Sequence, residues 1–196
     1  LDFGSGSGVN LDILKKYGYV DVHEKNKFAR SIIKKNKKVK NVYWNLKLKR
    51  NFYDIILLAD VIEHVKKPKI LINNLKKFLK KDGQIIITVP AYQFLFSKKD
   101  KVLGHYRRYN KSRLKAELSK FKIEEISYFN TFLSLPIIII TLLNKLFKRD
   151  YIKKVETTPN FILNNILYLI FKTEKNCLRY LNFPFGISIY AVARNV

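Results

Sequence analysis

The stretch that decides the fold is LDFGSGSG, residues 1–8, which places glycine at positions 4, 6 and 8. A short buried strand that runs into such a turn is typical of open α/β proteins. Glycine suits the turn because it lacks a Cβ atom and lets the backbone approach a ligand closely. We expect a helix over 9–17 after the turn. In an open α/β sheet this strand-to-helix turn lies at the carboxyl edge, where ligands bind.

The same octet argues against a dinucleotide site. The fingerprint G-x-G-x-x-G, counted from Gly4 and Gly6, requires glycine at position 9, and this chain has Val9. Asp2 places a carboxylate close to the loop, which suits a cationic ligand and would repel a pyrophosphate. The loop therefore favours a nucleotide-like ligand that carries positive charge.

Downstream of the loop, apolar runs and amphipathic segments alternate with short connections. This rhythm predicts a doubly wound, mostly parallel α/β sheet in a single domain, 1–196, whose first strand is truncated at the N-terminus. The strands are expected at 19–23, 39–43, 53–58, 84–89, 123–129 and 188–193, and the helices at 27–35, from Pro68 to an end at Asp82 and Gly83, and at 111–120 with Asn110 as N-cap.

Two very apolar helical stretches, 132–147 and 161–171, form an insertion at 131–176 before the last strand. Neither reaches the roughly 20 residues that a membrane-spanning helix needs. The flanking lysines leave three interpretations open: the stretches cover the core, form a dimer face, or lie in a membrane interface.

Composition bounds the class of protein. The chain has 196 residues, 47% of them hydrophobic, which is enough for one domain with a sizeable core. The single cysteine, Cys177, excludes an internal disulfide and gives no sign of a zinc cluster, so we expect no metal and a cytoplasmic setting. The net charge of +24 comes mostly from lysines scattered as KK pairs, which favours solvated helix faces and makes nucleic acid an unlikely partner.

Three further segments carry a family resemblance: YDIILLADVIEHV (53–65), LKKDGQIIITVP (79–90) and FPFGISIYAVAR (183–194). With the first octet, they resemble class I S-adenosylmethionine-dependent methyltransferases of the small-molecule type, similar to the ubiquinone-biosynthesis branch. The resemblance implies a seven-stranded sheet with an antiparallel last strand, S-adenosylmethionine as cofactor, and O-methylation of a small or lipid-linked acceptor. Because the chain contains no methionine, we also expect that an N-terminal segment is missing.

The resemblance assigns the cofactor site to the ends of successive strands. Glu24, 20 positions after Gly4, would accept the ribose hydroxyls, with Asp21 as the alternative. The adenine would lie by Trp44 and Asn45, where the family often has an acid. The complete expected cofactor set is Asp2, Gly4, Gly6, Gly8, Glu24, Asn45, Asp60, Glu63 and His64, the last three beside the methionine half.

The loop at 91–109 would cover the acceptor. His105 is the candidate general base, because the pKa of histidine is near the working pH. Arg107, Arg108 and Tyr109 would bind the acceptor, the arginines by holding a carboxylate or phosphate. The alternative is that Asp100 pairs with an arginine and the cluster only pins the loop.

Two other functions are consistent with parts of the sequence. An RNA or protein methyltransferase would use the positive charge, although ADVIEH stands where base-methylating enzymes have an NPPY-like tetrad. A binding or scaffolding module on the same fold would have lost activity. The apolar insertion and its basic flanks extend the expected localisation to peripheral contact with the inner face of a membrane, through 132–171.

Overall fold

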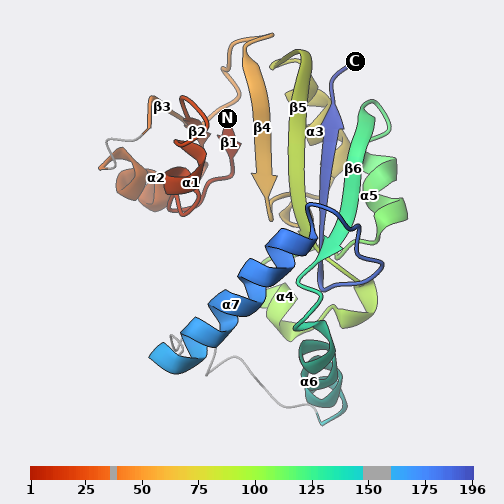
Figure 1. Ribbon diagram of the computed structural model, residues 1–196. Coiled ribbons are helices and arrows are strands. Elements are labelled where there is room, and N and C mark those ends of the chain that lie inside the picture. The colour runs from red at the N-terminus through yellow and green to blue at the C-terminus, as the bar shows by residue number, and fades with distance from the viewer. Residues whose placement is uncertain (36–38, 148–159) are drawn as a thin grey trace.

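The computed structural model describes residues 1–35, 39–147 and 160–196, and its centre is a seven-stranded sheet of order β3-β2-β1-β4-β5-β7-β6 (Figure 1). Only β7 runs antiparallel to its neighbours. The strands are β1 Asp2–Phe3, β2 Asp21–His23, β3 Asn41–Tyr43, β4 Tyr53–Ala59, β5 Leu79–Pro90, β6 Lys122–Phe129 and β7 Ser188–Arg194. The predicted fold class is confirmed, and the strand order reverses between β1 and β4, which is where open α/β sheets bind ligands.

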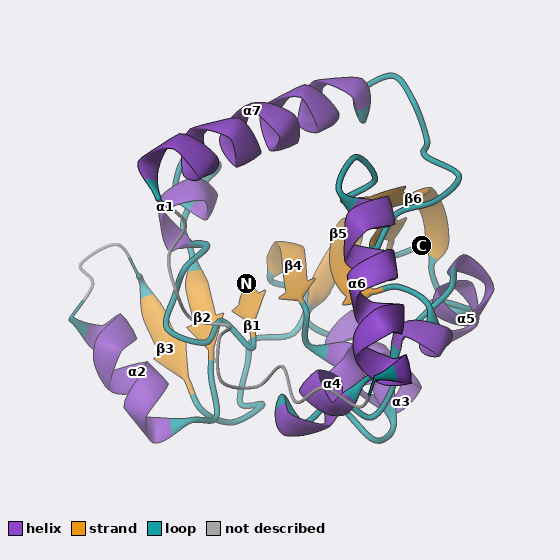
Figure 2. Ribbon diagram, turned by 90° about the horizontal axis from the view of Figure 1, so that it is seen from below, coloured by secondary structure: helices purple, strands orange, loops and turns teal. Residues whose placement is uncertain are grey.

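Helices lie on both faces of the sheet and beyond its carboxyl edge (Figures 1 and 2). They are α1 Leu11–Leu14, α2 Lys27–Lys34, α3 Pro68–Lys76, α4 Lys98–Val102, α5 Lys111–Glu117, α6 Ser134–Leu146 and α7 Phe161–Cys177, with short 3-10 turns η1 Ile62–His64 and η2 Gln93–Leu95. Asn110 caps α5 as predicted, since its side-chain oxygen accepts a hydrogen bond from the Arg113 backbone N–H at 2.7 Å.

Two expected helices are shorter by five residues or more in the structure, while those expected at 111–120 and 27–35 end at Glu117 and Lys34. The helix expected over 9–17 contracts to the single turn α1. The helix expected from Pro68 to Asp82 ends at Lys76, and β5 already begins at Leu79, which pairs with Tyr53. Gly83 permits this, because a Cβ there would lie only 3.0–3.2 Å from the backbone oxygens of Lys80, Tyr53 and Asp54.

The main core lies on the face of the central strands that α3 covers. Alternate residues of β5, including Ile85 and Ile87, are fully buried, as are Ile56 and Leu58 of β4. Helix α3 adds Ile72 and Leu75 to the same cluster. Each such side chain contributes about 2 kcal/mol through burial, so the sheet forms a rigid platform for the loops at its carboxyl edge.

Helices α6 and α7 extend past the ends of β4 and β5 (Figure 1), and most of their apolar side chains are exposed. Glu174 of α7 is buried and anchors this helix, accepting hydrogen bonds from the backbone N–H groups of Thr131 and Phe132 at 3.0–3.1 Å. The part of the expected insertion at 148–159 lies outside the described residues. No helix in the described ranges is long and apolar enough to cross a bilayer.

Candidate active site at the carboxyl edge of the sheet

The glycine loop adopts a conformation that needs glycine. Gly4, Gly6 and Gly8 all have positive φ, at 74°, 56° and 86°. A Cβ on Gly4 would lie 2.8 Å from Val61, and one on Gly8 would lie 2.6 Å from Leu11. At Gly6 no atom of the described residues, apart from Gly6 itself and its chain neighbours, lies within 4 Å of that position, so the middle of the loop borders open space that a ligand can use.

Asp2 lies beneath this loop in β1. It is 1% exposed, its Oδ2 atom has no hydrogen-bond partner in the described part of the chain, and burial raises its pKa to about 6. The hydroxyl of Ser5 in the loop is also buried without a partner. Buried polar atoms are normally hydrogen-bonded, so these two groups indicate a site built for a ligand.

Glu24 follows β2 and reaches the loop from the neighbouring strand. Its Oε2 accepts the Gly6 N–H at 2.8 Å, and its Oε1 accepts the Asn26 N–H at 2.7 Å. The alternative residue, Asp21, begins β2 at its other end, where its carboxylate binds the Asn41 amide and the Tyr53 hydroxyl at 2.8 and 3.0 Å. The geometry therefore brings Glu24 to the loop and gives Asp21 a part in joining strands.

The residues expected near the adenine lie after β3. Trp44 is 64% exposed, and Asn45 accepts a hydrogen bond from the Lys47 N–H at 3.2 Å. The backbone N–H of Glu24 donates to the Tyr43 carbonyl at 2.9 Å, so the ends of β2 and β3 are held together. Trp44 and Asn45 thus follow directly the strand that neighbours Glu24.

Asp60 and Glu63 follow β4, next to the glycine loop, but their environments differ. Asp60 is exposed, has a positive φ of 53°, and accepts a hydrogen bond from the Thr88 hydroxyl at 3.2 Å. Glu63 is 0% exposed, and neither of its carboxylate oxygens has a partner among the described residues. Burial raises the pKa of Glu63 to about 8.

His64 and His105 come from different loops and meet beside Glu63. Their rings pack edge to face with centroids 4.5 Å apart, and burial lowers the pKa of His64, with His105 adding to the effect. The Tyr106 N–H donates to the Glu63 carbonyl at 2.8 Å and joins the two loops. One ligand atom from each of Glu63, His64 and His105 lies within 4.8 Å of the others. Sequence analysis missed this cluster because His105 is far along the chain from the Glu-His pair.

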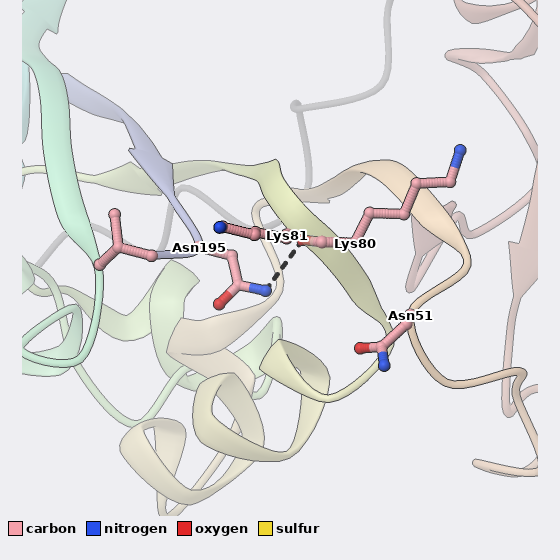
Figure 3. Close-up of a pocket in the computed structure, with 5 residues that line it drawn as sticks. Asn51, Lys80, Lys81 and Asn195 are labelled. Atoms are coloured by element: carbon pink, nitrogen blue, oxygen red, sulfur yellow. Dashed lines mark hydrogen bonds between the residues drawn. The ribbon is translucent and has the colours of Figure 1, made fainter.

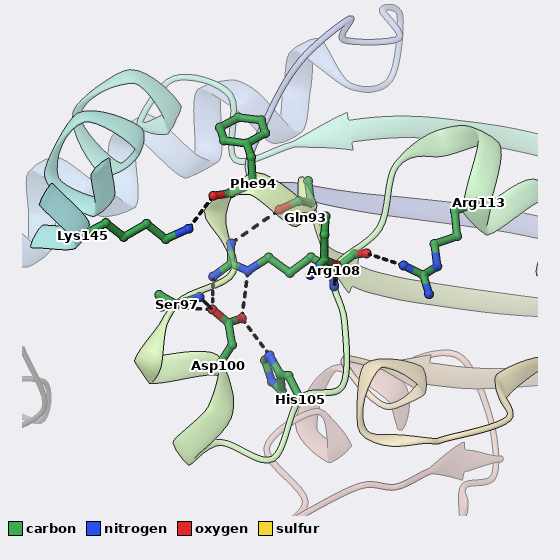
Figure 4. A network of polar contacts seen from close by, with 9 residues as sticks. Gln93, Phe94, Ser97, Asp100, His105, Arg108, Arg113 and Lys145 are labelled. Carbon is green, nitrogen blue, oxygen red and sulfur yellow. Dashed lines mark hydrogen bonds and ion pairs between the residues drawn. The ribbon is translucent and has the colours of Figure 1, made fainter. Parts of the chain in front are cut away.

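Asp100 is the centre of the polar network in the acceptor loop (Figure 4). It accepts hydrogen bonds from the Ser97 N–H and hydroxyl, from Arg108 at 2.8 and 2.9 Å, and bonds His105 Nδ1 at 3.0 Å. Burial alone would raise its pKa, but Arg108 and Ser97 overcome this and hold the pKa at about 2. Asp100 is therefore an anion that fixes both His105 and Arg108.

The three residues expected to bind the acceptor differ in their burial and in their hydrogen-bond partners. Arg108 is engaged by Asp100, which agrees with the alternative that this pair pins the loop. Tyr109 is 1% exposed and packs in the core, with its hydroxyl 3.4 Å from the Ile62 carbonyl, so it supports the loop in place of the expected acceptor contact. Arg107 binds the Lys66 carbonyl at 2.9 Å and remains near the surface.

A family model described as a methyltransferase domain matches residues 1–131. The chain belongs to this family. The solved structures that resemble this methyltransferase domain include an S-adenosylmethionine-dependent methyltransferase from Archaeoglobus fulgidus, with 17% identity, a TM-score of 0.59, and coverage of 98% of this chain and 84% of that one.

A second similar structure is phosphoethanolamine N-methyltransferase 2 from Haemonchus contortus in complex with S-adenosylmethionine, with 19% identity, a TM-score of 0.56, and coverage of 98% of this chain and 47% of that one. At these identities the likeness shows the fold. An uncharacterized protein of Methanocaldococcus jannaschii is 29% identical over 140 residues, or 69% of this chain. The methyltransferase domain spans 59% of the length of that relative.

A hollow of about 360 Å³ lies elsewhere in the domain, lined by Asn51, Lys80, Lys81, Asn195 and Val196 (Figure 3). Its residues precede β4, begin β5 and follow β7. These ends of the strands form the sheet edge opposite the glycine loop. The hollow is therefore separate from the candidate active site.

Proposed function

We propose that this methyltransferase domain binds S-adenosylmethionine at the carboxyl edge and transfers its methyl group to an oxygen of a small or lipid-linked acceptor. The observation that carries the cofactor assignment is the meeting of the positive-φ glycine loop with Glu24 and with Asp2, whose Oδ2 atom has no partner among the described residues. A buried carboxylate without a partner is costly unless a cation reaches it. A cofactor with a sulfonium and an ammonium group supplies that charge.

The residues fit this cofactor in three places. Glu24 accepts one N–H group on each of its oxygens, and each oxygen has a second lone pair that supports the proposed bonds to the two ribose hydroxyls. The open space at Gly6 leaves room for the ligand backbone, and the exposed ring of Trp44 offers a face for the adenine. Asp60, Glu63 and His64 follow the neighbouring strand β4, beside which the methionine half would lie.

His105 supports transfer to an oxygen. S-adenosylmethionine, when bound, supplies a methyl group activated by a sulfonium. Asp100 occupies His105 Nδ1 at 3.0 Å and so leaves Nε2 as the atom that can take the proton of an acceptor hydroxyl. Because Arg108 is held by Asp100, Arg107 is the arginine that remains to meet a carboxylate or phosphate of the acceptor.

The apolar helices support a lipid-linked acceptor and contact with an anionic bilayer. The side chains more than 40% exposed are Leu135, Ile139, Ile140, Leu142, Leu143 and Leu146 on α6, and Phe161, Ile162, Leu163, Ile166, Tyr168, Leu169 and Phe171 on α7. Exposed apolar surface of this extent marks an interaction site. The net charge of +24 complements anionic headgroups. We therefore propose an anionic lipid bilayer as the partner of this apolar surface.

Calorimetric titration with S-adenosylmethionine and S-adenosylhomocysteine tests the cofactor site. We expect micromolar binding that is lost in Gly6→Arg and reduced about tenfold to a hundredfold in Glu24→Gln, because hydrogen bonds to a charged group are worth about 1.5–3 kcal/mol. Gly18→Arg is the matched control, since Gly18 also has positive φ and open space around it. Absence of binding to the unaltered protein would refute the proposal and favour a scaffolding module.

Vesicle co-sedimentation tests the membrane contact. We expect the protein to sediment with anionic vesicles, and a variant with Ile139, Leu143 and Ile166 changed to glutamate to remain in the supernatant. Ile70→Glu is the control, because Ile70 is similarly exposed, at 54%, on the distant helix α3. Equal sedimentation of all variants, or none, would contradict the assignment. Methylation assays with paired hydroxyl and amine acceptors then separate transfer to oxygen from transfer to nitrogen.

A further inference from the structure

The cluster of Glu63, His64 and His105 contains a feature that methyl transfer from a sulfonium does not require. Glu63 is completely buried, and both of its oxygens lack partners in the described residues. The charges that act on it include those of Asp60 and Asp100, which are negative. A carboxylate in such surroundings is costly unless a cation sits beside it.

We propose that Glu63, His64 and His105 bind a divalent transition-metal ion, with Zn²⁺ as the best fit. Their ligand atoms all lie within 4.8 Å of one another. Two imidazoles and one carboxylate are a donor set that Zn²⁺ favours, whereas Mg²⁺ and Ca²⁺ prefer oxygen ligands throughout.

The surroundings of His105 match those of a metal ligand. Asp100 Oδ1 lies 3.0 Å from His105 Nδ1, and Arg108 fixes Asp100 from its other side. A histidine that binds a metal commonly donates its second ring N–H to a carboxylate in this manner, which orients the ring and raises the basicity of the ligating nitrogen. Nε2 of His105 is thus prepared to bind.

Closure around an ion requires only a small movement. Ligand atoms on one zinc ion lie about 3.3 Å apart, given zinc–nitrogen distances of about 2.0–2.1 Å, so movements on the order of 1 Å suffice. His64 is exposed, and rotation of its side chain can supply that movement. The backbone hydrogen bond from Tyr106 to Glu63 keeps the two loops at a fixed separation.

Three protein ligands leave at least one coordination position for an oxygen of the acceptor, an extension that rests on the proposed methyl transfer. His105 would then act as a ligand, and the ion would lower the pKa of the acceptor hydroxyl so that its proton passes to solvent. Binding of the metal itself does not depend on the transfer reaction. The two ideas can therefore be tested separately.

The test titrates Zn²⁺ into the EDTA-treated, dialysed protein by calorimetry, without cofactor or acceptor, and repeats the titration with Co²⁺ by visible absorption. We expect one site of micromolar or tighter affinity. Glu63→Gln and His105→Ala should each weaken binding by a factor of ten or more. Cys177→Ser is the control, because thiols bind zinc well and Cys177, the one cysteine of the sequence, could bind the added ion away from the proposed site.

Thermal unfolding gives a second readout. Zn²⁺ should raise the Tm of the unaltered protein more than that of Glu63→Gln, while Glu63→Gln should be the more stable of the two without metal because a neutral amide avoids the cost of burying or protonating this carboxyl group. Absence of binding, or binding that survives Glu63→Gln but is lost in Cys177→Ser, would overturn the proposal. Titration of the same samples with S-adenosylmethionine shows independently whether the proposed function holds.

Discussion

Replacement of Asp100 by asparagine should destabilise this domain far more than a comparable change at the surface. Asp100 is 1% exposed and takes part in five hydrogen bonds with Ser97, His105 and Arg108. Asparagine keeps one acceptor oxygen and no charge, so about two charge-assisted hydrogen bonds are lost, each worth about 1.5–3 kcal/mol. The partly buried Arg108 is also left without its counterion. We expect the free energy of unfolding to fall by about 3–5 kcal/mol, the range for breaking a buried ion pair.

The matched control is Asp54→Asn, which breaks the Asp54–Lys80 ion pair. That pair has a similar length, 2.7 Å, but its side chains are 80% and 49% exposed. Exposed pairs contribute about 0–1 kcal/mol, so this variant should be nearly as stable as the unaltered protein. Urea denaturation with EDTA present measures both changes. Equal losses for the two variants, or a loss below about 1 kcal/mol for Asp100→Asn, would refute the argument that burial makes this network strong.

Three further predictions concern the loop and the helices. Cofactor affinity should fall by up to tenfold per pH unit below about pH 6 and level off above it, because the pKa of Asp2 is about 6 and only the carboxylate form attracts the cationic cofactor. Calorimetric titrations across this pH range test this, and an affinity that did not change with pH would count against the assignment of Asp2. Gly8→Ala should lower the free energy of unfolding by about 2 kcal/mol or more, since its Cβ would lie 2.6 Å from Leu11. Gly18→Ala, with open space around it, should lower it less when both are measured by urea denaturation. Glu174→Ala should cost about 2–3 kcal/mol by leaving the buried N–H of Thr131 and the partly buried N–H of Phe132 unpaired. Limited proteolysis should then cut near α7 faster, and unchanged cleavage would contradict the anchoring role.

The sequence predicted the sheet well because each of its signals is local. The glycine loop, the apolar run of β4 and the Asn110 cap depend on neighbours within a few residues, and all three lie where they were expected. The start of β5 could not be predicted in this way. Its pairing with Tyr53 is a long-range contact, and it overrides the helical pattern of the residues before Asp82.

The candidate site was predictable in its residue types and less so in their roles. Glu24 and His105 lie at the sheet edge where the resemblance put them, yet the burial of Tyr109 and the engagement of Arg108 by Asp100 depend on how the loop folds back. The approach of His105 to Glu63 joins two loops that are distant in sequence. No local pattern encodes such a meeting, so the cluster of Glu63, His64 and His105 was visible only in three dimensions.

If the proposed membrane contact and lipid-linked acceptor hold, the attachment of the apolar helices has a consequence for regulation. Lys145 of α6 donates to the carbonyl of Phe94 in the acceptor loop (Figure 4), and Glu174 of α7 clamps the segment after β6. A bilayer that took up these helices would pull directly on the loop that carries His105. The bilayer would then dissolve the acceptor and also act as an allosteric effector. Turnover would respond to the amount of membrane surface as well as to the concentration of acceptor.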